Sequence, residues 1–216
     1  DDAFYRNDVS HISLPKSLVT IEDAFYGSTL KSISIPGNVK TIDAAAFHGC
    51  SYLESIVFEP SEEPLEFYVD SGHELSPFYN SNLRYIKIDR DVVMTSEDDI
   101  TLLNGGGLFH QRLKTEKTIV ILGDNVTKIS KGMFRNLGIS DITIPNSVKS
   151  IGTLAFAECD NLTDITIPSS VESISPNAFY NCTSLSKVDF QASDKPLEIG
   201  YQVAGDRIEE AIYAPN

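Results

Sequence analysis

Short runs of alternating apolar and polar residues recur along the chain, each of the form Ile-x-Ile or a close relative. They lie at 12–14, 33–35, 56–58, 86–88, 119–121, 142–144, 165–167 and 188–190. Such alternation of β-branched residues is typical of a short strand with its apolar ends inward and its middle residue outward. Proline follows four of the runs and ends them, because it lacks a backbone N–H. We therefore expect eight very short strands.

The strands belong to a repeat of about 23 residues, which is the distance from Ile142 to Ile165. Its pattern is L-x-x-I-x-I-P-x-x-V-x-x-I-x-x-x-A-F-x-x-C, and a fifth copy of the part after the strand, LGDNVTKI at 122–129, carries one extra residue. Eight of the eleven Phe residues occupy one repeat position: Phe4, Phe25, Phe47, Phe78, Phe109, Phe134, Phe156 and Phe179. Repetition of this kind indicates architecture and not a single active site.

Each repeat predicts one coil of a solenoid in which the strands stack as a parallel sheet about 4.8 Å apart. Val and Ile of V-x-x-I then point inward from the next wall, and the Phe rings stack into an aromatic column. Gly or Asn lies two residues after most of these Phe residues and tolerates φ > 0, so a tight turn is expected there. These turn positions are Gly27, Gly49, Asn80, Asn136 and Asn181.

The regular spacing fails in the middle of the chain. Successive strands lie 30 residues apart from Ile56 to Ile86 and 33 apart from Ile86 to Ile119, so we expect extended repeats with long loops at 59–80 and 91–112. A longer repeat type occurs twice, as FEPSEEPLEF at 58–67 and FQASDKPLEI at 190–199. We interpret 1–216 as one solenoid domain, with regular repeats at 1–58 and 119–190, irregular repeats at 59–118 and a long-repeat tail at 191–216. Because solenoids need capped ends, we expect a segment of a longer protein.

The stretch LTDITIPSSVESISPNAFYNC at 162–182, with its relatives at 4–58 and 119–190, resembles the BspA-like, or Treponema-type, leucine-rich repeats of bacterial surface proteins. The likeness covers about three-quarters of the chain. It implies a right-handed leucine-rich-repeat solenoid with irregular or short helical turns opposite the strands. It also implies a secreted or surface-attached module for adhesion or protein recognition, without catalysis of its own.

Composition narrows the classes of partner. The net charge of −14 disfavours binding to nucleic acid and to anionic membrane surfaces. No apolar run of 18 residues exists, so we expect no membrane insertion. The N-terminal stretch DDAFYRNDVS lacks the regions of a signal peptide, and we expect an extracellular or cell-surface protein whose signal peptide lies outside this chain.

The chemistry-bearing residues favour structure over catalysis. Cys50, Cys159 and Cys182 each lie three residues after a repeat Phe, which favours buried free thiols, although stacking of adjacent coils also brings Cys159 and Cys182 within disulfide range. The four His residues share no ligand spacing, and Asp98 and Asp99 lack the spacing of a calcium loop. No catalytic motif occurs, so we expect no enzyme, no metal and no cofactor.

One row of positions suggests a binding surface. The residues on either side of the first Ile of each strand are predicted to face solvent, and most are small and hydroxylic. The centre is larger and partly apolar, and we predict a protein-binding patch there: Ser55, Val57, Tyr85, Lys87, Thr118 and Val120. The alternative is that β-propensity alone selects such residues on an exposed sheet.

A second row follows the repeat Phe: Tyr5, Tyr26, His48, Tyr79, His110 and Tyr180. Aromatic residues in a line can stack on sugar rings, but they can equally cover the seam between coils, which we favour. The sequence therefore leaves three functions open, namely a protein-binding adhesion module, a carbohydrate-binding module and a passive spacer in a larger surface protein.

Overall fold

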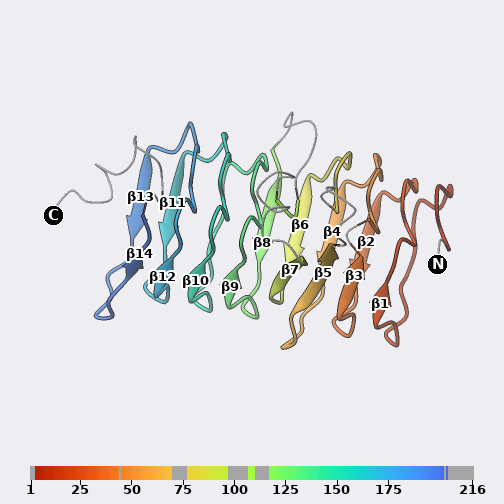
Figure 1. Cartoon of the computed structure of the whole chain (residues 1–216), viewed down its shortest axis with the longest axis horizontal. Helices are drawn as coiled ribbons and strands as arrows, with labels where there is room; N and C mark the ends of the chain where they lie inside the picture. Colours follow the sequence, from red (N-terminus) through yellow and green to blue (C-terminus); the bar gives the residue numbers. More distant parts are fainter. Residues whose placement is uncertain are drawn as a thin grey trace.

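The computed structural model is an elongated coil whose turns stack along one axis (Figure 1). It describes residues 3–43, 45–69, 77–96, 107–109, 117–201 and 203, without the side chains of Val69 and Ser96. Every strand pair is parallel, because each coil adds one strand in the same direction to each wall. The expectation of a leucine-rich-repeat solenoid is confirmed.

The Ile-x-Ile runs build the first wall. Its strands are β2 (Ser32–Ile35), β4 (Ser55–Phe58), β6 (Tyr85–Ile88) and β8 (Ile119–Leu122), followed after a break by β11 (Asp164–Ile167) and β13 (Lys187–Phe190). Ile33 pairs with Ile56, and Ile56 with Ile86, so the apolar positions stack coil on coil. In β2, β4 and β6 the second and fourth residues are buried, as the alternation predicts, whereas in β8 the buried residues are Val120 and Leu122 and not the expected Ile119 and Ile121.

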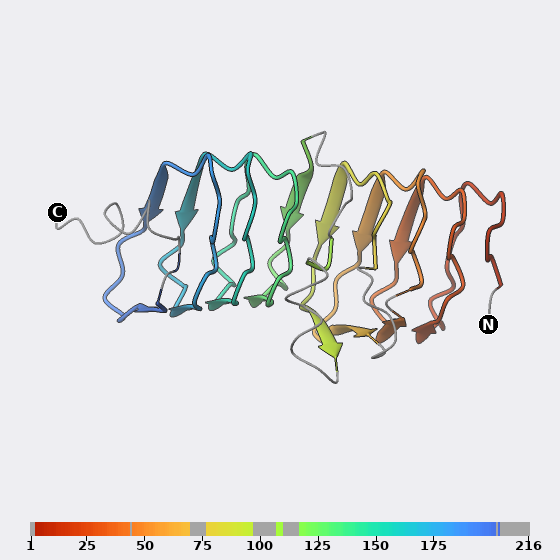
Figure 2. The same ribbon diagram turned by 45° about the horizontal axis from the view of Figure 1, so that its top comes forward.

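The V-x-x-I segments build a second wall, which the sequence did not predict as strands. Its members are β1 (Thr20–Ile21), β3 (Thr41–Asp43), β5 (Leu65–Val69) and β7 (Val92–Ser96), then β9 (Lys128–Ile129), β10 (Ser150–Ile151), β12 (Ser173–Ile174) and β14 (Glu198–Ile199). Figure 2 shows the two walls on opposite sides of the coil. The described residues contain no helix, so the connections are irregular turns.

The eight repeat Phe residues form one continuous column through the interior. Neighbouring ring centroids are 5.2–6.1 Å apart from Phe4 to Phe179. Seven of the eight side chains are buried, and Phe4 at the end of the column is half-buried. Each ring from Phe25 to Phe156 lies against the rings of two neighbouring coils, so no coil completes its own core.

The turn after each repeat Phe other than Phe109 adopts the left-handed conformation that the Gly and Asn residues predict. The φ angles are 63° and 75° at Gly27 and Gly49, and 54–66° at Asn80, Asn136 and Asn181. Arg6 and Glu158 occupy the same position with φ of 47° and 60°. The turn is therefore imposed by the coil even where the residue type does not favour it.

The three cysteines are buried free thiols, as the sequence favoured. The Sγ of Cys50 lies 3.0 Å from the carbonyl of Phe25, that of Cys159 3.2 Å from Phe134, and that of Cys182 3.0 Å from Phe156. In each case the thiol donates to the Phe of the preceding coil. Burial raises the pKa of the Cys50 thiol, and Ser28 partly opposes this shift.

Two of the eight expected strands do not form. Residues 12–14 and 142–144 are extended without strand pairing. The two copies of the longer repeat type place Phe67 beside Ile42 and Ile199 beside Ile174, in the same register of the second wall. Much of the predicted loops, at 70–76, 97–106 and 110–116, lies outside the described residues.

The Phe column yields a prediction for stability. We expect Phe156→Ala to lower the free energy of unfolding by about 3–5 kcal/mol in urea denaturation, because its ring contacts both neighbours and a cavity remains. Phe190→Ala, at a ring 38 % exposed, is the control and is expected to cost less than about 1 kcal/mol. If both variants lost the same amount of unfolding free energy, the Phe column would not be the main source of interior packing.

The buried thiols yield a second prediction. We expect native protein at about pH 8 not to react with Ellman's reagent, and all three thiols to react once it is unfolded. Because folding raises the pKa of Cys50, the unfolded state gains thiolate first, so this contribution to stability is lost as the pH rises past 9.0. Rapid labelling of native protein would show that the coils open readily.

Candidate functional site

The outward residues of the first wall form a single surface, which we call the exposed sheet face. It consists of Ser32, Ser34, Ser55, Val57, Tyr85, Lys87, Ile119, Ile121, Asp141, Thr143, Asp164, Thr166, Lys187 and Asp189. Ser55, Val57, Tyr85 and Lys87 lie here half-buried, where the sequence placed them. Their outward position is confirmed, and their role in binding remains a prediction.

The prediction that Thr118 and Val120 face solvent is wrong. They are only 3 % and 5 % exposed, whereas Ile119 and Ile121 are 58 % and 42 % exposed. In β8 the pairing sets Ile119 beside Tyr85 and Ile121 beside Lys87. The register therefore differs by one residue from the expected one, and it turns two isoleucines toward solvent.

The shifted register accounts for the apparent extra residue in this coil. With Val120 and Leu122 inward, Gly123 takes the position that Pro145 occupies in the next coil, and Val126 and Ile129 follow without a gap, as Val148 and Ile151 do there. The buried hydroxyl of Thr118 is satisfied by donating to the Leu83 carbonyl, 3.1 Å away. A Cβ at Gly123 would collide with the carboxylate of Asp89, so a larger residue there would require that side chain to move.

Two aspartates after β6 hold the turn that follows β8. Asp91 accepts bonds from the Thr127 N–H at 2.7 Å and its hydroxyl at 2.6 Å, and from the Lys128 N–H at 3.1 Å. Asp89 accepts from the N–H and the side-chain amide of Asn125. These contacts bridge the second wall where β7 and β9 are not paired. They replace backbone pairing and position the β8 coil.

The residue between these aspartates, Arg90, reaches in the opposite direction and is fully buried. Its Nη2 and Nε donate to the Glu63 carbonyl at 2.8 and 3.2 Å, and its Nη1 lies 3.5 Å from the Pro36 carbonyl. Burial lowers the pKa of this guanidinium, while the nearby Glu63 carboxylate raises it. Arg90 thus ties the β6 coil to the two preceding coils.

A groove lies on the face directly after β8. Lys117, Ile119 and Ile121 line one side, Ser140, Asp141 and Thr143 line the other, and its volume is about 470 Å³. Within the described residues, no backbone hydrogen bond joins 141–144 to β8 or to β11. The face is therefore hollowed where its sheet is interrupted.

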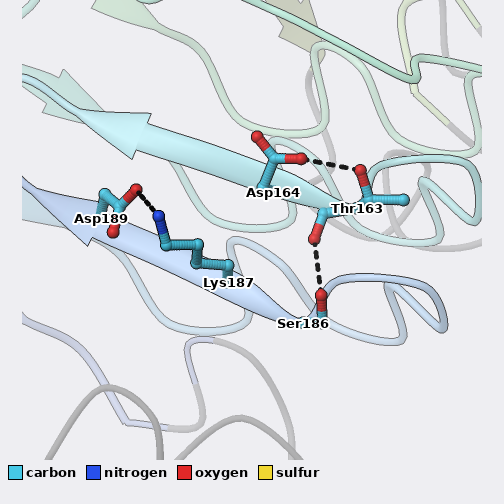
Figure 3. Close-up of polar contacts among 5 residues, drawn as sticks. All are labelled: Thr163, Asp164, Ser186, Lys187 and Asp189. Carbon is cyan, nitrogen blue, oxygen red and sulfur yellow. Dashed lines mark hydrogen bonds and ion pairs between the residues drawn. The ribbon is translucent and has the colours of Figure 1, made fainter.

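The face changes character along the solenoid axis. Serines dominate β2, and an apolar group of Val57, Tyr85, Ile119 and Ile121 occupies the centre. Beyond the groove, Asp141 and Asp164 are exposed and acidic. On β13, Lys187 forms an ion pair of 2.6 Å with Asp189 (Figure 3). An exposed apolar centre with a polar surround is typical of a surface that contacts another macromolecule.

The second aromatic row is stacked on itself. Tyr5 and Tyr26 have ring centroids 5.2 Å apart, Tyr26 and His48 5.1 Å, and His48 and Tyr79 5.6 Å. Both faces of the Tyr26 and His48 rings are thus covered by neighbouring coils, which favours the seam interpretation over sugar stacking. His110 lies outside the described residues.

A search for other chemistry covered the described ranges alone. There, no group of three or more His, Cys, Asp or Glu is arranged to hold a metal ion. No helix in those ranges has the length and apolar character to cross a membrane. Asp98, Asp99, His73 and His110 lie outside them.

Comparison with known proteins decides the family. The BspA type leucine rich repeat region matches in six copies over residues 1–98 and 108–202. The chain belongs to the BspA-type leucine-rich-repeat family. Proteins with leucine-rich repeats of this type are typically non-catalytic surface proteins, and the repeats generally serve protein interaction or adhesion. A search of curated proteins found no match to the sequence.

Several solved leucine-rich-repeat proteins are similar to this chain, and one of them shares its fold. A leucine-rich repeat protein from Bacteroides ovatus is 24 % identical with a TM-score of 0.55, over 93 % of this chain and 53 % of that one. A leucine rich cell surface protein from Faecalibacterium prausnitzii is 24 % identical, with a TM-score of 0.45 over 88 % and 55 %. The leucine rich repeat protein of T. pallidum is 22 % identical, with a TM-score of 0.44 over 94 % and 79 %. The chain thus spans about half the length of the first two.

The collision at Gly123 gives a test of how β8 is positioned. We expect Gly123→Ala to lower the free energy of unfolding by about 1–3 kcal/mol, although most coils carry the larger Pro there. In an Asp89→Ala background the same change should cost at least about 1 kcal/mol less, because the colliding carboxylate is gone. Exposed Asp124→Ala is the control. Additive costs in urea denaturation would contradict the described contact.

Proposed function

We propose that this chain is a non-enzymatic recognition module, at a cell surface or outside the cell, that binds a protein partner through the exposed sheet face. The contact surface comprises the predicted Ser55, Val57, Tyr85 and Lys87. Ile119 and Ile121 take the place of Thr118 and Val120.

The exposure of Ile119 and Ile121 carries the proposal. Both side chains stand on the rim of a groove, beside Tyr85 and Lys87, where the sheet is interrupted between β8 and β11. Burying such side chains gives about 25 cal/mol per Å² of apolar surface, and Tyr beside them is a frequent contributor to binding energy. β-propensity explains β-branched residues on a sheet, but it does not explain a groove beside them.

The other functions have less support. A carbohydrate-binding module needs open aromatic faces, and the row from Tyr5 to Tyr79 covers its own rings. A passive spacer needs no apolar face, and the other coils of this wall carry Ser, Thr, Asp or Lys at most outward positions. A protein partner accounts for both observations.

A binding screen tests the proposal. The chain is immobilised for biolayer interferometry against a panel of extracellular matrix proteins and a panel of glycans. We expect saturable binding to a protein, weakened at least about tenfold by Ile119→Ser with Ile121→Ser, which corresponds to about 1.4 kcal/mol. Val19→Ser is the matched control, because Val19 is 50 % exposed and belongs to the second wall.

Three results would count against the proposal. Binding to glycans alone would favour the carbohydrate module. Protein binding unaffected by the double variant, or affected equally by Val19→Ser, would place the contact elsewhere. No saturable binding across both panels would favour the spacer.

A further inference from the structure

We infer that the exposed sheet face binds a second copy of this chain, related to the first by a two-fold axis that runs along β8. This rests on the proposed function in one respect, since it takes the same face as the contact surface. The basis is the order of side chains along the face, which is complementary to itself about β8.

Charge on the face is distributed unevenly around its apolar centre. Lys87 lies on β6, one strand before β8, whereas Lys117 belongs to the β8 coil itself, two residues before Ile119. Asp141 lies one coil after β8, and Asp164 lies on β11, two coils after it. Along the solenoid axis, the positive charge of Lys87 therefore comes before Ile119 and Ile121, and the negative charges of Asp141 and Asp164 come after them.

Two such faces can be related by a two-fold axis parallel to the strands or by one along the solenoid, and only the first brings Lys87 close to Asp141 of the second copy. An axis parallel to the strands reverses the order of the coils, so β8 meets β8, and β6 meets 141–144 of the second copy. An axis along the solenoid would instead lay each coil on its own counterpart, so Lys87 would face only side chains of β6, Asp141 only those of 141–144, and the two would not meet. A two-fold interface must be complementary to itself, and the first arrangement satisfies that requirement.

The first arrangement brings matching chemistry together at three levels. Ile119 and Ile121 cover their own counterparts. The Tyr85 hydroxyl can donate to Asp141 of the second copy, and Lys87, on the next outward position of the same strand, is long enough to reach that carboxylate. Further out, the Ser55 hydroxyl faces Asp164 of the second copy.

The ends of the face are also compatible. The Lys187–Asp189 ion pair of 2.6 Å would face the serines of β2, so charge already neutralised within one copy meets neutral side chains in the other (Figure 3). Asp164 accepts a bond of 2.8 Å from the hydroxyl of Thr163, which orients its carboxylate on the face. Among the charged residues of the face, Lys117 meets its own counterpart near the axis, whereas Lys87, Asp141 and Asp164 face no like charge.

The size of the face predicts a weak dimer. Four-residue strands spaced about 4.8 Å apart from β2 to β13 give roughly 450 Å² per copy, below the roughly 800 Å² of a standard interface. The net charge of −14 on each copy opposes association, but salt screens it beyond about 8 Å at physiological ionic strength. We expect a dissociation constant between about 10 μM and 1 mM.

Sedimentation velocity on the full chain, from about 10 μM to about 1 mM, tests the inference. Lys87→Asp alone and Asp141→Lys alone should each weaken dimerisation at least about fivefold, because each puts like charges together twice. An equimolar mixture of the two variants should associate as wild type does, since unlike charges then meet at both contacts. Lys40→Asp, an exposed residue of the second wall, is the control for net charge.

Several outcomes would overturn the inference. A chain that stays monomeric throughout the concentration range excludes the second copy. Dimers that are insensitive to the single variants, or a mixture that fails to recover, exclude this arrangement. A monomeric chain that still binds a foreign protein, dependent on Ile119 and Ile121, would overturn this inference and leave the proposed function intact. Dimerisation without binding to any foreign protein would support this inference and overturn the proposed function.

Discussion

The structure depends on the contact between one coil and the next. A coil of about two dozen residues has too few apolar side chains to surround itself, so its Phe, Ile and Val side chains are buried only when another coil stacks on each side. The Phe column makes this visible, because rings from Phe4 to Phe179 follow one another at 5.2–6.1 Å. The thiols follow the same rule, since each bonds to the Phe carbonyl of the coil before it.

That constraint also explains where the molecule differs from a regular solenoid. In the middle of the chain, the second wall is interrupted between β7 and β9, and the first wall between β8 and β11. Side-chain hydrogen bonds replace backbone pairing there. Asp89 and Asp91 accept bonds from the turn after β8, and Arg90 donates to carbonyls of the two coils that precede β6. The coils therefore still stack, but the sheet face has a groove after β8 with two exposed isoleucines beside it.

Much of the fold could be predicted from the sequence, because each repeat contains residues that identify its inward positions. Pro after the strand, Phe in the interior and Gly or Asn in the turn identify the inward positions wherever all three occur. The β8 coil lacks the Pro, and TIVIL at 118–122 is apolar or β-branched throughout, so two registers fit the alternation equally well. The choice between them is made by contacts distant in sequence, namely Thr118 with Leu83 and Gly123 with Asp89. The second wall was missed as sheet because V-x-x-I does not have the two-residue period of a strand.

The account of function rests on that register, because it alone brings Ile119 and Ile121 to the surface. Single cysteines introduced at 118, 119, 120 and 121 test it directly, since the native thiols are buried. The rate of labelling by a maleimide is measured on folded protein for each variant. The account predicts fast labelling at 119 and 121 and slow labelling at 118 and 120. Fast labelling at 118 and 120 instead would show that the isoleucines point inward, and the proposed contact surface would be wrong.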